Sequence, residues 1–192
     1  MYDTFQQYLD QKILLTNDEK ELIRSVSILK KLRKKQYLLQ EGDVWKYHAF
    51  ITKGCMRMYA VDDKGVEHII YFGVENWWIG DRESLLSQMP SRLNIDAIED
   101  SEVILFTDPN FEMICSKIPV FRDMVNAIIS RSLNVNQNRI LSSISKTAEE
   151  KYLEFIQKYA GFAMRIPQAM IASYLGIKPE TLSRIRNTIG KK

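Results

Sequence analysis

The sequence is poor in the residues that mark several large classes of protein. Its 192 residues include only 2 cysteines, Cys55 and Cys115, which form neither a disulfide framework nor a paired metal-binding motif. Only 8 glycines and 5 prolines are present, which excludes a collagen-like or low-complexity chain. No apolar run is long enough to span a membrane, and the start lacks the basic and apolar segments of a signal peptide. We therefore expect a globular protein of the reducing cytoplasm with no membrane partner.

Residues for catalysis and metal binding are also scarce. The 2 histidines, His48 and His68, are too few and too far apart for the clustered ligands of a metal-binding barrel. Two cysteines cannot hold an iron–sulfur cluster. The sequence contains no phosphate-binding glycine loop and no nucleophile–base pair. These absences argue against an enzyme and predict no metal site.

Positive charge is concentrated at the C-terminal end. The formal net charge is +3, but residues 140–192 carry net +5 and residues 1–139 carry net −2. A basic C-terminal segment on a mildly acidic body is typical of a polyanion-binding protein, although a solvated tail has the same composition. A second basic run, at residues 30–35, is interpreted as the solvated end of a helix and the loop that follows it.

The pattern of apolar residues predicts an α+β protein. Residues 3–32 have helical spacing, with a cap within residues 16–18. Residues 36–107 contain short runs of aromatic and β-branched residues separated by turns, which favours a β-roll or jelly roll. The clearest hairpin has arms at 56–61 and 67–72 and a turn at 62–65. We assign residues 1–118 to this sensor-like domain.

A long helix without glycine or proline is predicted after Pro119. It would extend to about residue 145, roughly 37 Å at 1.5 Å per residue, which is longer than the roll it would cover. A seam between two subunits explains that length better than a single core helix does. We therefore predict a homodimer and assign residues 119–146 to a dimerisation helix. The predicted seam residues are Phe121, Val125, Ile128 and Val135.

The last 28 residues have the organisation of a helix-turn-helix. Thr147 and Glu150 form a predicted capping box at the start of the helix that comes before these 28 residues. Pro167 suits the start of the next helix, Gly176 the turn, and Pro179 the start of the second helix. In this motif the start of the second helix enters the major groove of DNA. We assign residues 147–192 to a DNA-binding domain.

The second helix presents side chains that suit the edges of bases and the phosphates. Arginine can bond guanine with two parallel hydrogen bonds, and a carboxylate accepts from cytosine. We predict that Glu180 and Arg184 read bases. The full predicted DNA-binding set is Gln168, Lys178, Glu180, Thr181, Ser183, Arg184 and Arg186. A plain helical hairpin with a charged face is the alternative.

The string IASYLGIKPETLSRIR resembles the helix-turn-helix of the Crp–Fnr family of bacterial transcription regulators. The family's E-T/S-x-x-R core corresponds to residues 180–184. The resemblance covers nearly the whole chain and implies a cyclic-nucleotide-binding-type double-stranded β-helix, a long dimer helix and a winged-helix-like DNA-binding domain. It also implies double-stranded DNA and RNA polymerase as partners. Because the sequence ends at Lys192, we expect the second strand of the wing to be short or missing.

The segment at residues 76–106 resembles the family's phosphate-binding cassette but departs from it. Asp81 replaces the family's glutamate, and Ser91 and Arg92 stand in swapped order at the Arg and Ser/Thr positions. On a strand, one step turns a side chain to the other face. We therefore expect cAMP to be a poor ligand, with another small effector or none in its place, and no required cofactor. The predicted effector pocket comprises Gly80, Asp81, Ser91, Arg92 and Asn94.

Together these observations predict a cytoplasmic, homodimeric transcription regulator that reads a pseudo-palindromic operator through the helix starting at Pro179. The first alternative is a small-molecule sensor whose helix-turn-helix does not bind DNA. The second is a cupin-like enzyme, which would require a bound metal.

Overall fold

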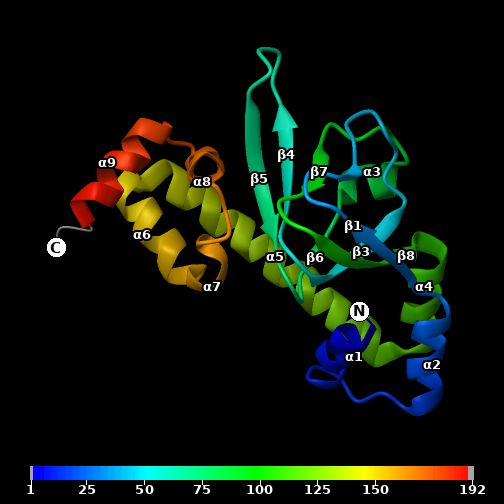
Figure 1. Ribbon diagram of the computed structural model, residues 1–192. Helices are drawn as coiled ribbons and strands as arrows, with labels where there is room; N and C mark the ends of the chain where they lie inside the picture. Colours follow the sequence, from blue (N-terminus) through cyan, green and yellow to red (C-terminus); the bar gives the residue numbers. More distant parts are fainter. Residues whose placement is uncertain (1, 190–192) are drawn as a thin grey trace.

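The computed structural model describes residues 2–189 and contains two parts joined by a long helix (Figure 1). Within these described residues, eight strands form two antiparallel sheets, with orders β1-β8-β3-β6 and β2-β7-β4-β5. The strands are β1 (Ile28–Leu32), β2 (Tyr37–Leu39), β3 (Tyr47–Lys53), β4 (Met56–Val61), β5 (Glu67–Gly73), β6 (Trp78–Ile79), β7 (Asn94–Ala97) and β8 (Ser101–Thr107). The helices are α1 (Tyr2–Asp10), α2 (Asn17–Ser25), α3 (Arg82–Ser87), α4 (Asp108–Lys117), α5 (Pro119–Ser145), α6 (Ala148–Lys158), α7 (Ala160–Ala163), α8 (Gln168–Leu175) and α9 (Pro179–Ile189).

The two sheets close on each other as the predicted β-roll. Alternate residues of β3 and β8 point inward, because side chains of a strand alternate between its two faces. The interior cluster includes Ile51, Met56, Ile95, Val103 and Leu105, all nearly inaccessible to solvent. The predicted hairpin is confirmed as β4 and β5. They project beyond the rest of the roll in Figure 1.

The helical prediction for residues 3–32 is correct only in part. The capping box at Thr16 and Glu19 starts α2, but that helix ends at Ser25. Residues 28–32 instead form β1, which pairs with β8. The apolar residues of this stretch fit a helix as well as a strand. The stretch forms a strand because the edge of β8 offers it a pairing partner. The basic run therefore lies on an edge strand and the turn after it.

The other faces of both sheets are covered by helices. Phe50 and Phe106 of the first sheet pack with α1, α4 and the start of α5, together with Trp78. The second sheet shares a core with α6, α7, α8 and α9, in which Phe72 contacts Phe155 and Tyr174. The helix-turn-helix part is thus packed against the roll of the same chain.

The C-terminal part consists of helices as far as it is described. Residues 147–189 form α6 to α9, and residues 190–192, where the wing would continue, lie outside the described residues. The predicted capping box of Thr147 and Glu150 is present at the start of α6. Across residues 2–189, none of the helices has both the length and the apolar composition that crossing a membrane requires.

Candidate nucleic-acid interface

The helix pair α8 and α9 has the geometry of a helix-turn-helix. Gly176 ends α8 in a left-handed conformation, with φ of +65°, which glycine adopts without steric cost. The backbone then turns within three residues, and Pro179 starts α9. Leu182 and Ile185 are 1% and 8% exposed, and they anchor α9 on the shared core. The opposite face of α9 is therefore the one that points outward.

That outward face carries the residues predicted to read DNA. Lys178, Glu180, Ser183, Arg184 and Arg186 are exposed, and Thr181 is half-buried. The helix has Glu180 in its first turn, where a carboxylate complements the positive end of the helix dipole. Glu180, Ser183 and Arg184 lie in one row along the helix, which presents an acceptor and donors to a groove of DNA.

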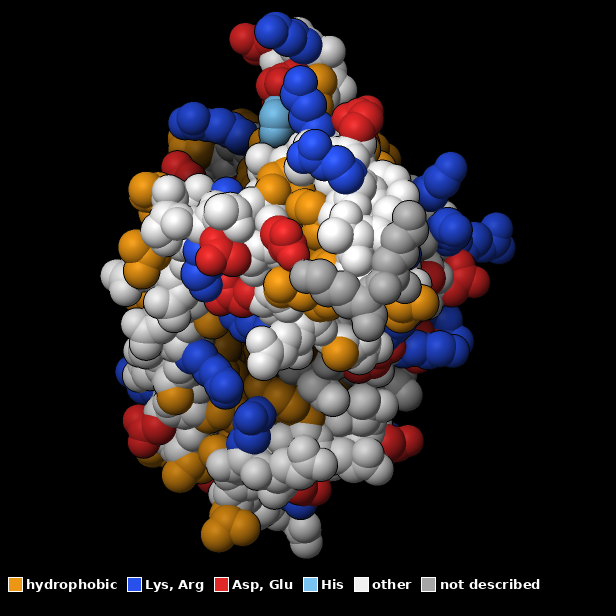
Figure 2. All heavy atoms as spheres, turned by 90° about the vertical axis from the view of Figure 1, so that its left-hand side faces the viewer, with side chains coloured by type: hydrophobic (Ala, Val, Ile, Leu, Met, Phe, Trp, Pro, Cys, Tyr) orange, Lys and Arg blue, Asp and Glu red, His pale blue; other side chains and the backbone are white. Residues whose placement is uncertain are grey.

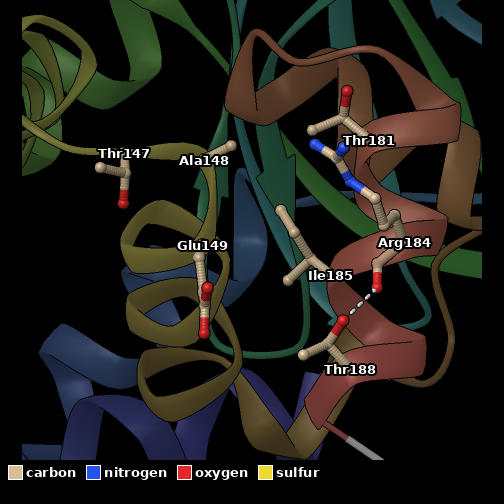
Figure 3. Close-up of a pocket in the computed structure, with 7 residues that line it drawn as sticks. All are labelled: Thr147, Ala148, Glu149, Thr181, Arg184, Ile185 and Thr188. Carbon is tan, nitrogen blue, oxygen red and sulfur yellow. Dashed lines mark hydrogen bonds between the residues drawn. The ribbon is translucent and has the colours of Figure 1, made fainter.

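A hollow of about 350 Å³ lies beside this row, between the start of α6 and α9 (Figure 3). Figure 3 shows the guanidinium of Arg184 extended along α9 toward Thr181. The hollow is lined by Thr147, Ala148, Glu149, Thr181, Arg184, Ile185 and Thr188. The sequence predicts the helix start at Thr147 but not its place beside the recognition helix, because that depends on how α6 packs against α9.

Charges of both signs lie on this side of the molecule. In Figure 2, the described Lys and Arg side chains on this face are interspersed with Asp, Glu and hydrophobic side chains.

Gln168, predicted as an additional phosphate contact, has a different environment. It is the first residue of α8 and is half-buried. Its side-chain oxygen Oε1 is buried and has no hydrogen-bond partner among the described residues. A side chain whose amide is directed inward is a poor candidate for a phosphate contact in this conformation.

The carboxylate of the cassette-like segment is engaged within the chain. Asp81 is 7% exposed and caps α3, accepting hydrogen bonds from the backbone amides of Glu83 and Ser84. Its second oxygen accepts from the Ser91 hydroxyl at 2.7 Å. Both oxygens are therefore engaged in holding the loop together.

The other predicted pocket residues do not surround an open cradle. A Cβ on Gly80 would lie 2.6 Å from the indole nitrogen of Trp45, so that ring occupies the space beside the glycine. Asn94 is buried and accepts from the backbone amide of Glu41. Arg92 is exposed. The set thus fits a self-contained loop better than a cyclic nucleotide.

Comparison with known proteins shows which proteins have a similar sequence and architecture. The family described as "Cyclic nucleotide-binding domain" matches residues 29–117. An "Anaerobic regulatory protein" of Pasteurella multocida (strain Pm70) is 27% identical over 193 residues, covering 93% of this chain and 70% of that protein. The "Fumarate and nitrate reduction regulatory protein" of Yersinia pestis is 28% identical over 187 residues, covering 90% and 74%. These matches support a transcription regulator of the Crp–Fnr type.

Solved structures of Crp–Fnr regulators show the same fold. FixK2 from Bradyrhizobium japonicum superposes with a TM-score of 0.72 at 24% identity, covering 86% of this chain and 85% of that one. A regulator of the crp/fnr family from Eubacterium rectale has a TM-score of 0.69 at 18% identity, covering 96% and 88%.

One residue of the predicted dimer seam requires correction. Phe121 is fully buried in the core formed with α1 and α4, so a partner subunit cannot reach it. Val125 and Ile128 are half-buried against the same core, and Val135 is also half-buried. Periodicity identifies the apolar residues of a helix but not what covers them. Here the first half of α5 packs within its own chain.

A different face of α5 carries apolar side chains that are exposed. Leu133, Ile140 and Ile144 are 58%, 61% and 79% exposed, and half-buried Ile129 continues their row toward the N-terminal end. Spacings of four, seven and four residues place these four side chains on one stripe of a helix. The sequence contains this stripe, but the buried residues of α5 mask it until their packing is known.

Proposed function

We propose that the chain binds double-stranded DNA as a homodimer and reads a pseudo-palindromic operator through α9. The observation that carries the proposal is the division of α9 into two faces, with Leu182 and Ile185 buried and the polar residues exposed. Glu180 and Arg184 read base edges, since their side chains match cytosine and guanine. Lys178, Thr181, Ser183 and Arg186 contact bases or hold phosphates.

The exposed stripe of α5 is the proposed dimer seam. Ile129, Leu133, Ile140 and Ile144 would pair with the same residues of a second copy, because a two-fold axis brings identical surfaces together. Such pairing removes from water the apolar area that the single chain leaves exposed. Two recognition helices would then lie about 34 Å apart, one turn of the duplex.

We also propose that DNA binding requires neither a cyclic nucleotide nor another cofactor. Support comes from Asp81, whose two oxygens are already engaged, and from Trp45, which fills the space beside Gly80. An arginine that is to hold a phosphate must face the cradle, and Arg92 is exposed instead. A different small effector in the roll stays open to test.

The proposed site of action is the cytoplasm, with RNA polymerase as a partner and with no enzymatic activity. The relatives supply the argument: one from Pseudomonas aeruginosa is named "Transcriptional activator protein anr" and is 23% identical over 168 residues. An activator of transcription acts by recruiting or stimulating polymerase. Co-purification of the polymerase on operator DNA in the presence of the chain, and not without it, would support this part.

Selection from a random pool of duplexes tests the function. The purified chain, with no added ligand, is expected to enrich a two-fold-symmetric motif, and affinity for that motif should fall as salt rises. Enrichment only after addition of cAMP would contradict the proposed independence of a cyclic nucleotide. Absence of enrichment with and without cAMP or cell extract would favour a sensor that does not bind DNA.

A further inference from the structure

The strand β5 forms an edge of its sheet, yet part of its outer side is hydrogen-bonded. In the order β2-β7-β4-β5 it has one neighbouring strand. The hydroxyl of Ser173 on α8 accepts from the amide of Ile69 at 3.0 Å and donates to the carbonyl of Glu67 at 2.8 Å. A serine thus takes the place of a neighbouring strand, satisfying groups that an edge leaves unpaired.

Arg139 joins three parts of the molecule at the same place. It projects from α5 and donates to the carbonyls of Ile69 and Ile70 on β5. It also donates to the backbone carbonyl of Tyr174 on α8 at 3.1 Å. The guanidinium carbon of Arg139 lies 4.0 Å from the centre of the Tyr174 ring. One guanidinium therefore connects the long helix, the β-roll and the helix-turn-helix through hydrogen bonds and a cation–π contact.

A second attachment lies in the short segment between α7 and α8. Arg165 makes two hydrogen bonds of 2.9 Å to the carboxylate of Glu75, and it also bonds Glu99. Burial alone would raise the pKa of Glu75, but its hydrogen bonds with Arg165 and the amide of Gly54 outweigh burial and lower that pKa. The indole of Trp77 packs beside this attachment against Phe162.

These contacts leave the reading face of α9 free. The groups that hold α8 are the Arg139 side chain of α5, backbone groups of β5 and carboxylates in the loops of the roll, whereas Glu180, Ser183 and Arg184 are exposed on α9. The attachment therefore does not compete with DNA for the same atoms. What it fixes is the direction in which α9 points relative to α5.

We infer that Arg139, Ser173 and Arg165 are positioning residues that lock the helix-turn-helix to the edge of β5 and so restrict the dimer to one half-site spacing. This inference rests on the proposed function. The covalent link between α5 and α6 is the short segment at Lys146 and Thr147, which is bridged by hydrogen bonds of Lys146 to Glu154 and of Lys151 to the carbonyl of Ser143. The contacts of Arg139, Ser173 and Arg165 add the roll to this attachment. One added base pair moves a half-site by about 3.4 Å and rotates it by roughly 35°. A dimer whose two α9 helices are held in fixed positions cannot follow that displacement, whereas a dimer whose α9 helices are loosely held can.

The test compares the unmodified chain with the double variant Arg139→Gln, Ser173→Ala. Arg131→Gln is the matched control, since Arg131 lies on the same helix, is exposed and takes no part in these contacts. Affinities are measured for the selected operator, for the same operator with its spacer changed by one base pair in either direction, and for a single half-site.

The unmodified chain and the control should lose about tenfold in affinity for each changed spacer, comparable to one mismatched base pair. The double variant should lose less than about threefold and keep its affinity for the single half-site. An unchanged spacing penalty in the double variant would overturn the inference, and so would an equal loss on half-site and full operator.

Amide hydrogen exchange separates this inference from the proposed function, because it requires no DNA. The amide of Ile69 should exchange about tenfold faster in Ser173→Ala than in the unmodified chain, since its acceptor is removed. Unchanged exchange would refute the lock itself. A chain that shows the exchange effect but binds no operator would refute the proposed function and, with it, the role in half-site spacing.

Discussion

Truncation of Leu133 should weaken the dimer by about two orders of magnitude. Leu133→Ala removes three carbons, worth roughly 2.4 kcal/mol if fully buried at about 0.8 kcal/mol per group. In the single chain 58% of the side chain is exposed and available for burial by a partner, which reduces the loss to about 1.4 kcal/mol per subunit. Both subunits carry the change, so the total is about 2.8 kcal/mol, or roughly 100-fold in the dissociation constant.

Sedimentation velocity over a range of concentrations measures that constant. Val120→Ala is the control, because Val120 is also on α5 and 43% exposed but faces away from the stripe of Leu133 and Ile140. It should change dimerisation by less than about twofold. A dissociation constant for Leu133→Ala that also stays within twofold of the unmodified chain would refute the assignment of the seam.

Two further predictions concern stability, measured by urea unfolding. Gly54→Ala should destabilise the chain by about 2–5 kcal/mol, because φ is +98° and the new Cβ would lie 2.7 Å from the Cα of Ser101. Burial lowers the pKa of His48 despite its bond to Asp108. The unfolded chain therefore binds a proton at His48 more readily than the folded chain does. The free energy of unfolding should decline as the pH falls below about 6.5, and it should decline more steeply in the unmodified chain than in His48→Gln.

Each of these has an outcome that contradicts it. Gly65→Ala is the control for Gly54→Ala, because Gly65 also has a positive φ, +78°, but no atom lies within 4 Å of the added Cβ. Its loss of stability therefore measures the backbone contribution without the collision that occurs at Gly54. Equal losses in the two variants would show that the collision is relieved at no cost. A pH profile that is identical in the unmodified chain and His48→Gln would show that this imidazole does not contribute to acid sensitivity.

Elements with strong local signals were predictable from the sequence. Gly176 and Pro179 mark the turn between α8 and α9, and the absence of glycine and proline after Pro119 marks the long helix α5. The hairpin of β4 and β5 follows from its turn residues at 62–65. These signals act within a few residues of the chain, where conformational preference and spacing decide the structure.

Features that depend on packing between distant segments were not predictable. The segment at 28–32 is a strand because β8 offers it a free edge. Phe121 belongs to the core of its own chain because α1 and α4 cover it. Ser173 contacts β5 across more than 100 positions of sequence, and a lone serine in a helix gives no indication of such a contact.

The central claim is that α9 reads DNA bases, and loss of one base contact tests it most directly. The chain and Arg184→Ala are titrated against the selected operator and against operators with each base pair of the half-site replaced in turn. Arg184→Ala should cost about 1–3 kcal/mol on the selected operator and become indifferent to the base at one position per half-site. An equal loss of affinity on every sequence, with all preferences retained, would contradict base reading by this helix.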